Sequence, residues 1–186
     1  ITEPELPELN GDEPVTEQIT IPATPDVKNY SYTVVDGDVY YRENSVMVKT
    51  ELNATAKERV MGMVELRDCV RRLIDLQMED ADALSILVEQ KKLNQLYDAY
   101  TAKFGLINSR GNALAFDRDS AYYLLCSLEN IDEDGKLISK ADMFTKRTIQ
   151  PHRAVTHVDT AVEALAVSIG ERARVDLPFM AELSGK

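Results

Sequence analysis

Between residues 30 and 48, apolar and aromatic side chains alternate with polar ones, which is the pattern of half-buried β-strands. The alternating side chains on the two sides of Asp36-Gly37 are Tyr30, Tyr32, Val34, Val39 and Tyr41. An Asp-Gly pair between β-forming residues is a strong hairpin signal. We therefore expect a hairpin here, followed by a short third strand over 46–48.

The pattern then changes to a helical period. Asn53 is a suitable N-cap for a helix over 54–79, and Asp80 or Asp82 for a second one that ends at Phe104, before Gly105. The inward positions of the two helices are Ala56, Val60, Met63, Val70, Leu73, Leu76, Leu84, Val88, Leu93, Leu96, Tyr97 and Tyr100. Because the connection is short, the two helices should form an antiparallel hairpin, and such hairpins commonly act as spacers or partner-binding arms.

Shorter elements follow. We expect a turn-rich loop over 106–116, a helix over 120–128, and a second β-hairpin whose turn is 132–135. Asp159 should cap a helix that ends at Ile169 because Gly170 breaks it, and Asp176 should cap a last helix. The expected inward side chains of this helix pair are Val158, Val162, Leu165, Ile169, Leu177, Met180 and Leu183. The pair could be the front of a helix-turn-helix that reads DNA, or simply core.

Together these elements predict an α+β fold that is mostly α, with a long antiparallel helical hairpin, small β-hairpins and a C-terminal helix pair. Residues 1–28 hold five of the seven prolines and seven acids against one base. A segment with that composition cannot bury enough apolar surface to order itself, so we expect an extended acidic, Pro-rich linker. A single accessory domain should occupy 29–186. Because the chain starts within a linker and without Met, we interpret it as a fragment of a longer protein.

The charge balance argues against one class of function. The 186 residues carry 21 basic and 32 acidic side chains, a net charge of −11, which is unlike a dedicated nucleic-acid-binding domain. No apolar run approaches the ~20 residues of a membrane span, and no signal peptide opens the chain. Cys69 and Cys126 lie 57 positions apart in apolar surroundings, as expected for reduced core thiols of a cytoplasmic protein.

Catalytic and cofactor motifs are missing. The sequence has no glycine-rich phosphate loop and no Asn/Asp-Pro-Pro-aromatic loop of an amino-methylating enzyme. His152 and His157 have few carboxylates beside them, and 132–135 lacks the spacing of a calcium loop. We therefore expect no catalytic residue, no cofactor-binding residue and no metal site.

One stretch is locally basic. Residues 140–158 include four basic residues and one acidic residue, and two more arginines follow. The candidate DNA-binding residues are Lys146, Arg147, Arg153, Arg172 and Arg174. Such a strip could neutralise several phosphates, giving weak and non-specific binding. The alternative is a solvated surface that pairs with acidic partners in the parent protein.

Six strings of the sequence are distinctive: DCVRRLI (68–74), KLNQLYD (92–98), FGLINSRGN (104–112), SAYYLLCSLE (120–129), ADMFTKRTI (141–149) and EALAVSI (163–169). They resemble a family of very large proteins of Gram-positive conjugative and phage-like mobile elements. Proteins of this family join an adenine-specific DNA methylase module to a Swi/Snf-type helicase. The resemblance covers about 32–186 and concerns a connecting region, because the catalytic motifs of both modules have no counterpart here.

The resemblance implies a non-catalytic accessory domain that spaces the two modules of its own parent chain and contacts DNA. Gln150 stands where we would expect a base, which argues against the whole basic strip gripping phosphate. Two alternatives remain open. One is a divergent fragment of the DNA methyltransferase itself, which would need a parallel sheet with a glycine-rich turn. The other is a pure protein–protein interaction module.

Overall fold

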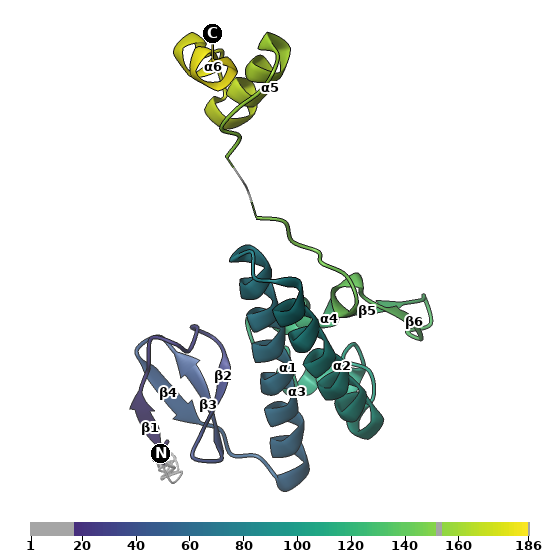
Figure 1. Cartoon of the computed structure of the whole chain (residues 1–186). Coiled ribbons are helices and arrows are strands. Elements are labelled where there is room, and N and C mark those ends of the chain that lie inside the picture. The colour runs from purple at the N-terminus through teal and green to yellow at the C-terminus, as the bar shows by residue number, and fades with distance from the viewer. Residues whose placement is uncertain (1–16, 152–153, 186) are drawn as a thin grey trace, which may run out of the picture. The chain divides into compact units, whose positions relative to one another are not determined.

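In the computed structural model, the described residues are 17–151 and 154–185, and they divide into two compact units, the first ending at Ile149 and the second beginning at Gln150 (Figure 1). The first unit contains two small antiparallel sheets and a helical hairpin, and the second contains two helices. The fold is α+β and mostly helical, as predicted.

The larger sheet consists of β1 (Thr20–Pro22), β2 (Tyr32–Val35), β3 (Asp38–Glu43) and β4 (Val46–Lys49), in the order β1-β4-β3-β2. Successive side chains of a strand point to opposite faces. Val39 and Tyr41 of β3 therefore join the main core, whereas Tyr40 packs with Val27 and Met47 in a small cluster on the other face. The predicted hairpin and third strand are both confirmed.

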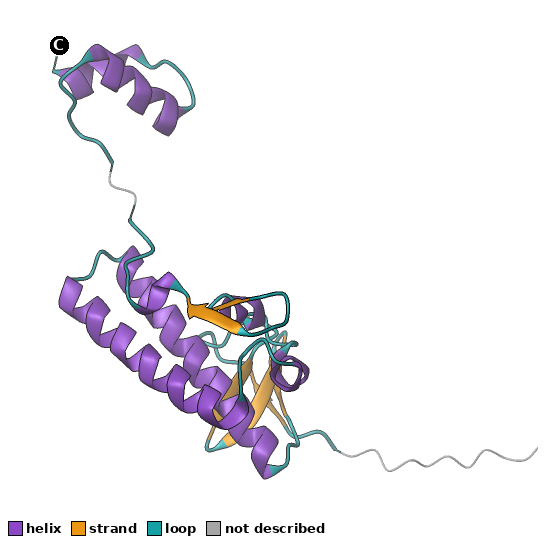
Figure 2. Ribbon diagram, turned by 90° about the vertical axis from the view of Figure 1, so that its right-hand side faces the viewer, coloured by secondary structure: helices purple, strands orange, loops and turns teal. Residues whose placement is uncertain are grey.

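The helical hairpin is also confirmed, but the prediction that Leu84 and Val88 point inward is wrong, because both side chains are exposed. Helix α1 (Ala54–Met78) begins after Asn53, whose side chain accepts a hydrogen bond from Ala56 N, and α2 (Ala83–Phe104) ends at Gly105. The helices run antiparallel, since Lys103 near the end of α2 forms an ion pair with Glu58 near the start of α1 (2.6 Å) (Figure 2). The Tyr100 ring lies against Gly62, where a Cβ would be only 2.7 Å from Tyr100 Cδ2.

The chain after α2 covers the core of the first unit. It forms α3 (Arg110–Phe116), α4 (Tyr122–Cys126), the hairpin of β5 (Glu129–Ile131) and β6 (Leu137–Lys140), and the 3₁₀ helix η1 (Asp142–Phe144). The predicted second hairpin is confirmed. The prediction of a loop over 106–116 is wrong, because α3 buries Asn112 and Phe116 completely and so gains a core face that its Gly and Asn content hides.

Two buried polar side chains hold this covering segment. Asn112 Oδ1 accepts hydrogen bonds from Arg59 Nη1 and Tyr100 Oη (both 2.7 Å), and its Nδ2 donates to the Leu106 carbonyl (2.7 Å). The carboxylate of Glu129 accepts hydrogen bonds from Tyr97 Oη, Ile107 N and Asn108 N at 2.7–3.0 Å. Both residues lie within the strings that carry the family resemblance. Their presence in those strings is explained by a structural role.

The second unit contains α5 (Ala161–Arg172) and α6 (Leu177–Ser184). The helix pair is confirmed, but α5 begins after Thr160, which forms a capping box with Glu163, and it continues through Gly170. The predicted inward face is wrong in part. Val162, Ile169 and Leu177 are exposed, whereas Ala164 and Ser168 are buried, so α5 packs through smaller side chains than the predicted apolar stripe.

The expected boundaries also differ from the structure. Strand β1 falls within the range we expected to be a linker, yet it pairs with β4 in register Thr20↔Val48, Ile21↔Met47 and Pro22↔Val46. A strand this short gives little sequence signal, and its partner strand supplies the hydrogen bonds that order it. Residues 1–16 lie outside the described residues. The range 29–186, which we expected to form a single domain, is divided between two units at residues 149 and 150.

Candidate nucleic-acid interface

The turn between α5 and α6 is fixed by one buried hydroxyl. Ser168 Oγ donates to the Arg174 carbonyl (2.8 Å) and accepts a hydrogen bond from Asp176 N (2.9 Å). Ala173 has a positive φ of 53°, which ends α5 in a left-handed residue. Asp176 caps α6 by accepting from Phe179 N, and this hydrogen bond, with the nearby Arg174, lowers the pKa of the Asp176 carboxyl. The result is a tight helix-turn-helix.

Two candidate arginines lie at this turn. The Arg172 guanidinium lies over the Phe179 ring, with Cζ 4.4 Å from the ring centroid. Arg174 forms an exposed ion pair with Asp176 (Nη2–Oδ2 3.2 Å), and its side chain is 72 % exposed. An exposed ion pair and a single cation–π contact each contribute only about 1 kcal/mol or less to stability, so both guanidinium groups can exchange these contacts for a phosphate at small cost.

The other candidate residues belong to the first unit or lie outside the described residues. Lys146 is exposed and 3.4 Å from Asp142. Arg147 is engaged within the fold, because its Nη2 donates to the Gln77 carbonyl (2.8 Å) and to Asp80 Oδ1 (2.9 Å) at the end of α1. Arg153 is outside the described residues. The five bases are therefore divided between the units, and whether they share one surface stays a prediction.

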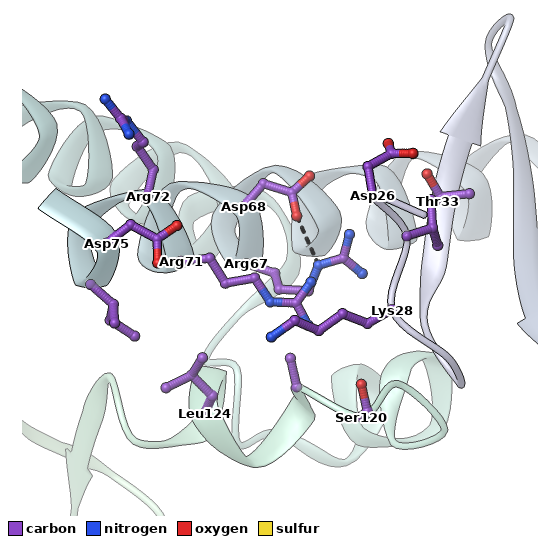
Figure 3. A pocket seen from close by; sticks show the side chains of 13 residues that line it. Asp26, Lys28, Thr33, Arg67, Asp68, Arg71, Arg72, Asp75, Ser120 and Leu124 are labelled. Atoms are coloured by element: carbon purple, nitrogen blue, oxygen red, sulfur yellow. Dashed lines mark hydrogen bonds and ion pairs between the residues drawn. The ribbon is translucent and has the colours of Figure 1, made fainter. Parts of the chain in front are cut away.

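A second group of cations, which the sequence reasoning missed, surrounds an open cleft of about 680 Å³ in the first unit (Figure 3). Arg67, Arg71 and Arg72 of α1 line it together with Lys28, on the loop before β2. Arg67 is buried and bonded to Asp119 (Nη1–Oδ2 2.8 Å) and to Asp68 (Nε–Oδ1 2.9 Å). Arg67 and Arg71 are one helical turn apart, a like-charge spacing that disfavours a helix and could have marked the site in the sequence.

The cysteines do not form a site. Cys69 is buried and Cys126 half-buried, and both are free thiols, as expected. Burial, and then the hydrogen bond to Glu89, raise the pKa of Cys69 to about 12. Among the described residues, no group of His, Cys, Asp and Glu is arranged to hold a metal ion. The described helices also include none that is long and apolar enough to span a membrane.

Comparison with known proteins gives one match. Residues 157–186 match the family model described as "Probable helicase, winged helix domain". No curated protein and no solved structure matches the chain. The match coincides with the α5–α6 unit, and it agrees with the helicase part of the family resemblance. The C-terminal unit is therefore similar to a helicase-associated winged helix domain.

Proposed function

We propose that this chain is a non-catalytic accessory region of a helicase-type protein, in which the α5–α6 unit contacts DNA. The observation that carries the proposal is the winged-helix match over 157–186, on the unit where Arg172 and Arg174 flank a tight turn between two helices. In helix-turn-helix proteins the second helix enters the major groove, while residues at the turn and helix ends contact phosphates.

The finer parts of the proposal come from the sequence resemblance. The parent is then a cytoplasmic DNA methylase/helicase of a mobile element, and the α1–α2 hairpin spaces its modules. The described sheets favour this over a methyltransferase fragment, since both are antiparallel and a methyl-donor site of the expected type uses a parallel sheet.

Fluorescence anisotropy with duplex and single-stranded oligonucleotides over a range of salt concentrations tests the DNA contact. Changing both Arg172 and Arg174 to Ala should flatten the plot of log affinity against log salt by about two units. The matched control is Lys91→Ala, which removes an exposed charge from α2 and should leave the slope unchanged.

Lys146→Ala tests the remaining described candidate that the fold leaves exposed. Arg147 is unsuitable, because its side chain bonds to the Gln77 carbonyl and to Asp80 at the end of α1, so its loss would also disturb the fold. If neither DNA form binds at low salt, or if the Arg172/Arg174 variant keeps the full slope, the helix pair is a protein-binding surface and the DNA contact is wrong.

A further inference from the structure

Four basic side chains line the cleft beside α1, and among the described residues only one of them, Arg67, forms an ion pair. Asp119 is fully buried and accepts hydrogen bonds from Arg67 Nη1, Tyr32 N and Ala121 N, all at 2.8 Å. These contacts, with the Arg67–Asp68 pair, use two carboxylates to hold the single Arg67 guanidinium between α1, β2 and α4. Arg67 is thereby fixed at the floor of the cleft.

Arg71 and Lys28 are placed differently. Figure 3 shows both side chains directed into the cleft toward Arg67, whereas Arg72 points away. Within the described part of the chain, neither the Arg71 guanidinium nor the Lys28 ammonium has an ion-pair or hydrogen-bond partner. Arg71 is half-buried, and its pKa is lowered, first by burial and then by the neighbouring Arg67 charge.

The charges of Asp119, Asp68 and Asp75 act on Arg71 from a distance, but none of these acids forms an ion pair with Arg71 or Lys28. Asp68 is already bonded to Arg67 Nε, and Asp26 and Asp75 are exposed to solvent at the rim. Arg71 is half-buried beside Arg67, and an anion held between Arg71 and the exposed Lys28 would offset part of the free-energy cost of that burial. The remaining lining suits a polar ligand with an apolar part, since Thr33 and Ser120 present hydroxyl groups and Ile74 and Leu124 form an apolar wall.

We propose that this cleft is a binding site for a phosphate group, held by Arg71 and Lys28 over the fixed Arg67. A guanidinium presents paired N–H donors that match two phosphate oxygens, and an ammonium adds a third donor from the opposite wall. The site belongs to the first unit and does not depend on the DNA contact proposed for α5–α6. The phosphate belongs either to a small phosphate compound or to a nucleic-acid backbone.

Two probes distinguish these sources. Isothermal titration calorimetry with inorganic pyrophosphate measures the small ligand, and anisotropy with a labelled single-stranded oligonucleotide measures the backbone. We expect Arg71→Gln and Lys28→Gln each to lower the affinity for whichever probe binds by about tenfold. Lys91→Gln, the matched removal of an exposed charge, should leave the affinity within about twofold. The Arg172/Arg174 variant should bind pyrophosphate with the affinity of the unchanged chain, even if it no longer binds DNA.

The outcomes are separable. Pyrophosphate binding that depends on Arg71, with oligonucleotide binding that does not, assigns the cleft to a small phosphate compound. Oligonucleotide binding that depends on Arg71 and is displaced by pyrophosphate assigns it to a nucleic-acid backbone. If neither probe binds, or if both bind equally well to Arg71→Gln and Lys28→Gln, the phosphate site is wrong.

A stability measurement guards against a purely structural role. Because Arg71 faces a like charge and has no described partner, Arg71→Gln should unfold at the same urea concentration as the unchanged chain, or at a higher one. A clear loss of stability would show that Arg71 supports the fold, which would overturn the assignment of a ligand-binding role to it.

Discussion

At the scale of single residues, buried polar groups decide how the segment after α2 is held. Asn112 is fully buried and uses both ends of its amide, so Asn112→Ala leaves the Tyr100 hydroxyl and the Leu106 carbonyl without this partner. Unpaired buried groups are costly, and we expect a loss of about 2–4 kcal/mol in the free energy of unfolding. Urea denaturation followed by tyrosine fluorescence measures it.

The control for this substitution is Asn130→Ala, which removes an exposed hydrogen bond to Ser139 Oγ (3.0 Å) in the second hairpin. That change should stay within about 0.5 kcal/mol of the unchanged chain. Equal midpoints for the two variants would contradict the role given to Asn112.

The cysteines give a second prediction at this scale. Alkylation requires the thiolate, and burial raises the pKa of both Cys69, to about 12, and Cys126. At pH 8 Cys69 is therefore a neutral thiol in the folded chain. We expect iodoacetamide to label Cys69 about a hundredfold more slowly than free cysteine, and to label Cys126 more slowly than free cysteine. In urea both should react at the ordinary rate, and fast labelling of the folded chain would show that the thiols are accessible.

At the scale of elements, close packing places one glycine inside a helix. Glycine normally weakens a helix interior, so replacing it with Ala should stabilise. At Gly62, however, a Cβ would be 2.7 Å from the Tyr100 ring, which is buried between the two long helices. We expect Gly62→Ala to lower the melting temperature of the first unit, followed by the tyrosine signal.

The same change in α5 is the matched control. A Cβ at Gly170 would meet no other atom within 4 Å, so Gly170→Ala should keep or raise the helical signal in far-UV circular dichroism. A stabilising Gly62→Ala would mean that the hairpin is packed more loosely than the structure indicates.

Strand β1 gives another prediction for an element. We compare a chain starting at Glu17 with one starting at Thr24, which lacks the strand. The shorter chain exposes the edge of β4 and removes Ile21 from the cluster of Val27, Tyr40 and Met47. We expect its melting temperature to fall by about 5 °C or more. Equal melting temperatures would instead support the linker that the sequence suggested.

These elements show where the sequence was sufficient. The hairpin at Asp36-Gly37 and the helix beginning after Asn53 depend on local signals, a turn pair and an N-cap, and both were predicted. Strand β1 and helix α3 depend on distant partners: β4 for one, and Tyr100 with Arg59 for the other. Local patterns do not contain those contacts, so both were missed.

The candidate sites divide in the same way. Charge along the chain pointed to Arg172 and Arg174, which the structure places at one turn. Lys28 and Arg71 are 43 positions apart and meet only because the loop before β2 lies beside α1. Their convergence is a property of the tertiary fold, so the sequence reasoning missed it, and only the like-charge spacing of Arg67 and Arg71 could have indicated it.

At the scale of the whole molecule, charge is unevenly distributed. Residues 150–186 contain four bases and five acids, a net charge of −1, so −10 of the total of −11 lies in residues 1–149. An acidic chain repels the DNA backbone at long range even where arginines attract it at short range. The charge of the N-terminal segment should therefore reduce the DNA affinity of the α5–α6 unit.

Removing residues 1–16 tests this effect, because they contain five acids and no base, and the net charge changes from −11 to −6. We expect DNA affinity to rise several-fold at about 20 mM salt, where the Debye length exceeds ~20 Å. Near 0.3 M salt the gain should vanish, because screening then limits the effect of each charge to its immediate surroundings.

A full-length variant with the five acids changed to Gln or Asn should show the same gain in DNA affinity as the truncation, because charge and not length is responsible. A gain that persists at high salt, or that only the truncation shows, would mean that the segment covers the DNA-binding surface physically.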